Sequence, residues 1–359
     1  MHFIRFFGAC CAAIATVVAA GSPAFAQDKG QVVVATGGGT YLDALRETVF
    51  KPFEKSTGIK VIEATGPTLA RMRSMVNTGN PEWDVVEVYP PEYLQLSSEG
   101  MLHPLDYNVM DRSVFAEFPK DAITPFGVGT FEGALVIAFN TKKYTRANGP
   151  KSWGDVWDVK KFPGPRVLNA PNRGAGTLEA ALLADGVPTE KLYPLDLKRA
   201  YGALSRIKPN VVKWATSAAM MPEAVISGEA VIGIAPQGRI QLAKDQGAPV
   251  DYVWKEGLVD ISYWSILKGS KNVKNAQKFI EFASRAESQA ALAKRYVVGP
   301  LNKRAFDFIP PDRAMLLPTY PENKAKTIPV DPTWWAKKNA SGKSNLEVNN
   351  ALWNAWTLQ

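Results

Sequence analysis

Residues 32–98 alternate between strand-like and helix-like patterns, and this alternation constrains the fold more than any other feature of the sequence. Short apolar runs follow glycine-containing turns, and between them apolar residues recur at the three- and four-residue spacing of one helix face. The predicted strands lie at 32–35, within 57–65 and at 83–89, and the predicted helices at 41–53, 67–79 and 91–100. A βαβαβ order places strands side by side in a mainly parallel sheet flanked by helices.

The remainder of the chain continues this α/β pattern. A fourth buried strand is expected at 133–140, and helices are expected within 173–186, 196–207 and 272–283. Residues 222–238 predict a helix that turns at Gly228 into another strand, and the tail from residue 310 predicts helices laid over the body. The length is that of two domains.

The N-terminus has the pattern of a secretory signal peptide. Arg5 is the only charged residue before Asp28, a run of small and apolar residues follows it, and Ala24-Phe25-Ala26 has the small-x-small pattern of a cleavage site. The apolar run is short for a membrane span. We therefore expect export to the periplasm and cleavage after Ala26.

Loss of the signal narrows the possible chemistry. It removes Arg5, both cysteines and His2, so the net charge falls from +8 to +7 and His103 is the remaining histidine. Disulfides and thiol chemistry are then excluded, and a histidine-based metal site is disfavoured. Interspersed charges without a basic block argue against nucleic-acid binding. An exported α/β hydrolase is the alternative of another class, but no G-x-S-x-G nucleophile motif occurs.

Three glycines, Gly37 to Gly39, follow the first strand and precede a helix, as in sites that hold an anion with backbone N–H groups. The dinucleotide fingerprint would need glycine where the chain has Leu42, and no P-loop occurs. The glycines, with Thr40, are therefore predicted to approach a small ligand. A tight strand–helix turn that holds no ligand is the alternative.

Six segments occur in the order and spacing of one family. They are STGIKVIEAT, WDVVEVYPPEYLQLSSEGMLHPLD, ALVIAFNTKKY, PKSWGDVWDVKKFPGPRVLN, ISGEAVIGIAPQGR and LKGSKNVKNAQKFIEFA. On these segments the chain resembles the periplasmic solute-binding proteins of ABC importers, of the spermidine/putrescine-binding type. The resemblance covers nearly all of the chain after the signal.

The resemblance implies an α/β fold of two lobes, with the ligand in the cleft between them. It implies a first lobe of 32–138 and 261–305, a second lobe of 139–260 and 306–359, and hinges near Phe139–Asn140 and Asp260–Ile261. It also implies a monomer without a cofactor, which binds a small molecule and presents it to a permease in the inner membrane. No catalytic residue or metal ligand is expected.

The cleft differs from that of a polyamine receptor, whose carboxylates hold ammonium groups. Where the family places one acid, PNRGAGT has Arg173, and the family's other acidic position falls on Ser262 while its tryptophan falls near Asp260. Arg prefers carboxylate or phosphate and repels ammonium. Arg239 adds a second positive charge.

Acids remain available at Glu87, Glu132 and Asp260. Opposite charges facing one cleft suit a zwitterion such as γ-aminobutyrate. Two alternatives remain. The ligand is a small organic anion, or Arg173 pairs with Glu179 and does not contact the ligand. The predicted ligand-binding residues are Gly38, Gly39, Thr40, Tyr41, Glu87, Tyr89, Glu132, Arg173, Gly174, Gly176, Thr177, Gln237, Arg239, Asp260, Ser262, Tyr263 and Trp264.

Overall fold

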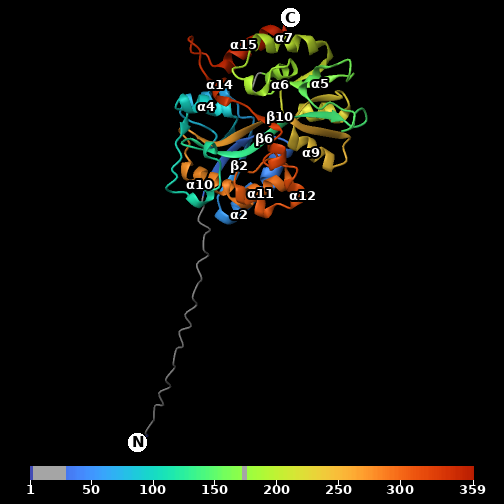
Figure 1. The fold of residues 1–359 in the computed structure, drawn as a ribbon. Coiled ribbons are helices and arrows are strands. Elements are labelled where there is room, and N and C mark those ends of the chain that lie inside the picture. The colour runs from blue at the N-terminus through green and yellow to red at the C-terminus, as the bar shows by residue number, and fades with distance from the viewer. Residues whose placement is uncertain (3–29, 172–175) are drawn as a thin grey trace.

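The computed structural model describes residues 1–2, 30–171 and 176–359 (Figure 1). Most of the predicted signal peptide, together with Arg173 and Gly174, lies outside these residues. In the described part, strands join into one sheet of order β2-β1-β3-β10-β6-β9-β7-β8. The strands of this path are β1 (Gln31–Thr36), β2 (Lys60–Thr65), β3 (Val85–Val88), β6 (Gly127–Asn140), β7 (Arg166–Asn169), β8 (Val211–Ala215), β9 (Ile232–Pro236) and β10 (Val250–Leu267).

The first lobe is built on β1, β2 and β3, which pair in parallel as the sequence predicts. Helices α1 (Thr40–Leu45), α10 (Val273–Ser284) and α11 (Ala286–Arg295) cover one face of the sheet with an apolar core that includes Phe53, Trp264 and Phe279. Helices α3 (Leu69–Asn77) and α4 (Pro90–Ser98) cover the other face. Burial on both faces explains why these strands are apolar runs rather than alternating ones.

The second lobe is built on β7, β8 and β9, and β7 pairs in parallel with both neighbours. Helices α6 (Thr177–Ala184), α7 (Leu197–Ile207), α8 (Met220–Ser227) and α9 (Gln237–Asp245) surround it, and one core joins them. The helix predicted at 41–53 is present in three pieces: α1, a π-helical turn at Arg46–Phe50, and α2 (Lys51–Thr57). Pro52 has no N–H to donate, which favours such an irregular turn.

Two long strands, β6 and β10, run through both lobes and pair antiparallel with each other. Near one end β10 pairs with β3 of the first lobe, and farther along β6 pairs with β9 of the second. Residues 134 and 136–139 of β6 belong to the second core. Phe139 therefore belongs to the second core, and Asp260–Ile261 of β10 lies opposite Gly133 and Glu132 of β6, next to the first residue of that core on β6.

The C-terminal tail contacts both lobes. Residues around η7 (Lys303–Phe308) and α12 (Pro311–Ala314) pack against α11 of the first lobe, although the resemblance assigns 306–359 to the second. The chain then adds β11 (Thr327–Pro329) beside β10, and α14 (Pro332–Ala336) and α15 (Asn345–Thr357) join the second core. The tail thus contains the predicted helices and a short strand as well.

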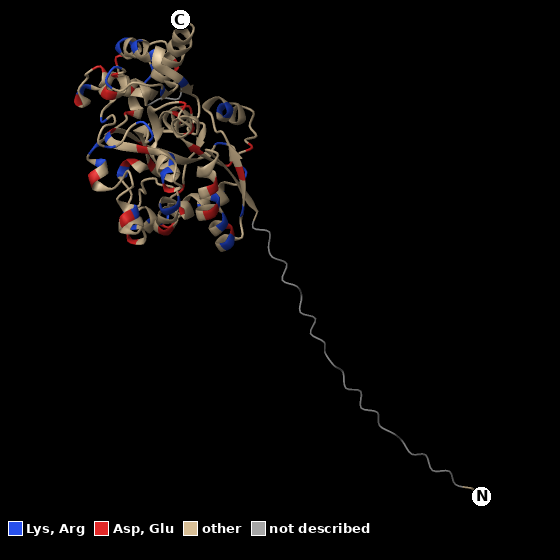
Figure 2. Ribbon diagram, turned by 90° about the vertical axis from the view of Figure 1, so that its right-hand side faces the viewer, with Lys and Arg blue, Asp and Glu red and all other residues tan. Residues whose placement is uncertain are grey.

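Acidic and basic residues are interspersed along the ribbon in Figure 2. Within the described residues, every helix is too short or too polar to cross a membrane.

Candidate functional site

The glycine turn after β1 meets the start of α9, so that the two lobes touch there. Gly39 has φ 69°, in the left-handed region that favours glycine, and immediately precedes α1. The Arg239 guanidinium donates to the Gly38 carbonyl at 3.2 Å and to the Thr40 hydroxyl at 3.3 Å. Arg239 of α9 therefore links the glycine turn to the second lobe, at a place other than the segment that begins α6.

Glu87, at the end of β3, is held by three hydroxyl groups. Tyr41 donates to Oε1 at 2.8 Å, Thr130 donates to the same oxygen at 3.2 Å, and Thr36 donates to Oε2. Burial raises the pKa of this carboxyl, against the lowering effect of the hydroxyl groups. Because both carboxylate oxygens already accept hydrogen bonds, Glu87 links β1, β3 and β6 and is less available to bind a ligand ammonium group.

A second glycine-containing segment of the sequence, residues 173–177, leads into α6, and we call it the second cradle by analogy with the glycine turn after β1. Gly176 has φ 130°, and its N–H donates to Glu179 Oε2 at 2.7 Å. Glu179 Oε1 accepts from Tyr193 Oη at 2.7 Å and Trp335 Nε1 at 2.9 Å, and the side chain is fully buried. The Thr177 hydroxyl donates to the Asn169 carbonyl at 2.8 Å. Glu179 therefore has three neutral donors in the described part of the chain, and these fix the helix N-terminus against the tail.

Asp260 lies where β10 passes from one lobe to the other, opposite Gly133 of β6. Within the described residues its carboxylate has neither a hydrogen bond nor an ion pair, although the residue is half-buried. Burial, together with the negative charges of Glu132 and Glu179, raises the pKa of Asp260 to about 7. An acid in this setting is stabilised by any cation that enters.

Glu132 is the second acid on this passage, and its side chain is only 7% exposed. Lys324 of α13 (Pro321–Lys324) donates to Oε2 at 3.1 Å, while Oε1 is buried and has no hydrogen-bond partner among the residues that the structure describes. Burial raises the pKa of Glu132, and the ammonium of Lys324 opposes that rise. The passage therefore carries two carboxyls and, from Lys324, one compensating positive charge among the described side chains.

Of the three aromatic residues predicted to line the cleft, two are partly exposed and one lies in the core. Tyr263 stacks on Tyr93 with ring centroids 4.6 Å apart and donates to the Asp121 carbonyl at 3.0 Å, and Tyr89 is 39% exposed. Trp264, in contrast, is 3% exposed and packs edge-on against Phe279 in the core of the first lobe. It is a core residue and not a wall of the cleft, because the strand pleat turns it away from its neighbour Tyr263.

Two further predicted residues are also buried by protein. Ser262 is 4% exposed and its carbonyl accepts from Thr130. Gln237 is 1% exposed, and its amide donates to the Tyr252 hydroxyl and to the Leu316 carbonyl. Sequence reasoning missed Lys324 and Trp335, because nothing in a tail rich in lysine and tryptophan distinguishes the ones that reach the acids.

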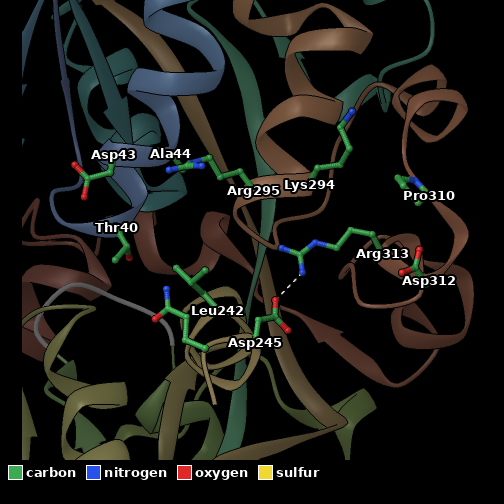
Figure 3. Close-up of a pocket in the computed structure, with 11 residues that line it drawn as sticks. Thr40, Asp43, Ala44, Leu242, Asp245, Lys294, Arg295, Pro310, Asp312 and Arg313 are labelled. Atoms are coloured by element: carbon green, nitrogen blue, oxygen red, sulfur yellow. Dashed lines mark hydrogen bonds and ion pairs between the residues drawn. The ribbon is translucent and has the colours of Figure 1, made fainter. Parts of the chain in front are cut away.

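The structure shows a cavity of 690 Å³ between α1, α9, α11 and α12 (Figure 3). Of the predicted ligand-binding residues, Thr40 alone lines it. Arg313 points across it and pairs with Asp245 of α9 at 2.8 Å. The lining is charged, with Asp43, Lys294 and Arg295 among it. This cavity lies beside the contact between Arg239 and the glycine turn and is separate from the Asp260–Glu132 pair.

In residues 30–171 and 176–359, no group of three or more His, Cys, Asp or Glu is arranged to hold a metal ion.

Comparison with known proteins gives a consistent result. The family of bacterial extracellular solute-binding proteins matches residues 48–324. The γ-aminobutyric acid-binding protein of Pseudomonas aeruginosa is 37% identical over 318 residues, which cover 86% of this chain and 88% of that protein. The spermidine/putrescine-binding periplasmic protein of Escherichia coli is 27% identical over 297 residues, covering 78% and 80%. The solved Atu4243 GABA receptor superposes with a TM-score of 0.79 at 31% identity, covering 91% and 97%.

Proposed function

Because the chain belongs to the family of bacterial extracellular solute-binding proteins, and is the receptor of an ABC importer rather than an enzyme, we propose its ligand class: a small ω-amino carboxylate such as γ-aminobutyrate. Two of the similar proteins bear the name of this ligand, whereas the polyamine-binding relatives are more distant. Receptors of this kind bind a small molecule and deliver it to a permease.

The observation that carries the proposal is Asp260, whose carboxylate has no partner among the described residues. A ligand ammonium beside it lowers the electrostatic cost of three neighbouring acids, Asp260, Glu132 and Glu179. Lys324 compensates only one oxygen of Glu132. The amine end of the ligand is therefore assigned to Asp260, with Glu132 as the nearest supporting charge.

The carboxylate end is assigned to the second cradle, which begins at Arg173 and ends at the N-terminus of α6. Gly176 and Thr177 are positioned there, and Arg173 and Gly174 complete the assignment from the sequence alone. A guanidinium and helix N-terminal N–H groups both favour an anion. A diamine lacks the negative group that this end would bind.

Calorimetry with Asp260→Asn tests the assignment. Wild type should bind γ-aminobutyrate, and the variant should bind it at least tenfold more weakly, since a charge-assisted hydrogen bond contributes about 1.5–3 kcal/mol. Asp312→Asn is the matched control, because Asp312 lines the separate cavity. Binding of putrescine but not γ-aminobutyrate by wild type would instead favour the polyamine assignment.

The remaining parts of the proposal are export, two lobes and a monomer. We place the periplasmic N-terminus at Gln27, after cleavage behind Ala26. We also propose that the chain passes between the lobes before residue 134 on β6 and near Asp260 on β10, which the membership of the two cores supports. Lobe rotation about these passages would open and close the cleft.

A further inference from the structure

The end of the C-terminal tail, residues 332–357 with α14 and α15, touches both lobes. Figure 1 shows α14 beside α4, and the two helices are in contact. Since α4 belongs to the first lobe and α14 to the core of the second, the tail spans the boundary.

The attachment to the second lobe is extensive. Trp335 is fully buried and donates to Glu179, and Trp353 and Trp356 pack around Trp214. Asn349 accepts from the Tyr201 hydroxyl at 2.8 Å. Separating the tail from this lobe would expose several tryptophans, so the tail moves with it.

Beside α3 and α4 of the first lobe, this end of the tail makes polar contacts. Gln95 of α4 donates from Nε2 to the Ser344 hydroxyl at 3.2 Å, and the two residues are 1% and 0% exposed. Arg73 of α3 holds Gln95 Oε1 at 3.1 Å and lies 3.9 Å from Glu347 of α15. If the lobes rotate apart, we expect these polar contacts to break, because separating α14 and α15 from the second lobe would instead expose buried tryptophans.

We propose that the tail is a latch, in which Ser344 and Glu347 engage Gln95 and Arg73 when the lobes close and release them when the lobes open. The inference rests on the proposed lobe closure but not on the identity of the ligand. The strength of the latch contacts sets the equilibrium between the open and closed receptor, and hence the rate at which a bound ligand dissociates.

Gln95→Met tests the latch, because it keeps the size of the side chain and removes both polar contacts. Ser98→Ala is the matched control in the same helix, since the Ser98 hydroxyl bonds only to the carbonyl of Gln95. Spin-label distances between the lobes should show a larger open fraction in ligand-free Gln95→Met. With γ-aminobutyrate as the probe, the dissociation rate should rise about fivefold, the factor of one buried neutral hydrogen bond.

The experiments can contradict the latch and the ligand assignment independently of each other. Unchanged distances and rates in Gln95→Met, with weakened binding in Asp260→Asn, would overturn the latch and leave the ligand assignment standing. If wild type does not bind γ-aminobutyrate, the ligand-free distances still decide the latch. If Gln95→Met does not fold, hydrogen exchange of the wild type replaces it: amides of 337–347 and of 36–41 should exchange with one common opening rate, and unrelated rates would contradict the proposal.

Discussion

At the residue scale, the acidic residues near the boundary between the lobes have different roles. Glu87 and Glu179 accept hydrogen bonds from neutral donors and hold elements in place. Asp260 has no such partner among the described residues, and its pKa is raised to about 7. The same functional group, a carboxylate, therefore stabilises the fold at Glu87 and Glu179, whereas at Asp260 it is available to bind a ligand.

The raised pKa of Asp260 predicts pH-dependent binding. An ammonium binds the carboxylate and not the carboxylic acid, so affinity for γ-aminobutyrate should fall as pH drops below about 7, by up to tenfold per pH unit. Titration calorimetry between pH 5 and pH 9 measures this, with Asp260→Asn as the control whose profile should be flat. Equal slopes in the two proteins would contradict the assignment.

Stability of the ligand-free protein should change in the opposite direction. The folded-state pKa of Asp260 lies above that of the unfolded chain, so the folded state binds the extra proton and its stability is lost as pH rises from about 4 to about 7. Asp260→Asn should therefore be more stable than wild type at pH 8, by on the order of 2 kcal/mol, and the two should converge near pH 4. Urea unfolding at both pH values checks the sign.

Arg173 gives a prediction of its own. Arg173→Lys keeps the charge but loses the bidentate fork, so γ-aminobutyrate affinity should fall, and Arg173→Ala should lower it further, by about 2–5 kcal/mol for a desolvated pair. Putrescine affinity should rise in Arg173→Ala, because a repelling positive charge is removed. Calorimetry with both ligands compares the outcomes, and a gain for putrescine with no loss for the carboxylate would defeat the assignment.

At the element scale, α6 depends on residues far away in sequence. Its N-terminus is fixed by Glu179, which itself depends on Trp335 of α14 and on Tyr193. The cradle of the second lobe is therefore built partly by the C-terminal tail.

Trp335→Phe should be destabilising because it leaves buried Glu179 with one donor fewer. The expected loss is about 1–3 kcal/mol in the free energy of unfolding. Trp334→Phe is the matched control, since its neighbouring ring is half-buried and lies against Tyr193 without bonding Glu179. Urea denaturation compares the two, and equal losses would show that the Glu179 bond contributes nothing specific.

At the scale of the whole molecule, the two lobes contact each other through small polar groups. Arg239 bonds the glycine turn, Arg313 pairs with Asp245 across the cavity, and Gln95 meets Ser344 in the tail. Contacts of this kind are individually weak, which suits a receptor that has to open and close.

Closure itself is testable by small-angle scattering. With saturating γ-aminobutyrate the radius of gyration should decrease, because the lobes rotate as rigid bodies about β6 and β10. Asp260→Asn, which is expected to bind at least tenfold more weakly, should show a smaller decrease at a γ-aminobutyrate concentration only a few times the wild-type Kd. An unchanged profile for wild type under saturation would contradict closure.

The sequence by itself determined the fold class and the family. Strand and helix periodicity are local, and six segments in fixed order carry the resemblance, which the family match confirms. The sequence also predicted the positions of β3, α4 and α6 to within a few residues, because apolar runs and the glycines or prolines that bound them are local features of the sequence.

Only the tertiary structure decided which side chains are free. Tyr263 and Trp264 are adjacent and aromatic, yet one stacks on Tyr93 while the other is core, since register on a twisted strand decides the face. Likewise the sequence presents Glu87, Glu132 and Asp260 as equal acids. Their partners come from β1, the tail or nowhere in the described chain, and such distant pairings leave no local pattern for a single sequence to show.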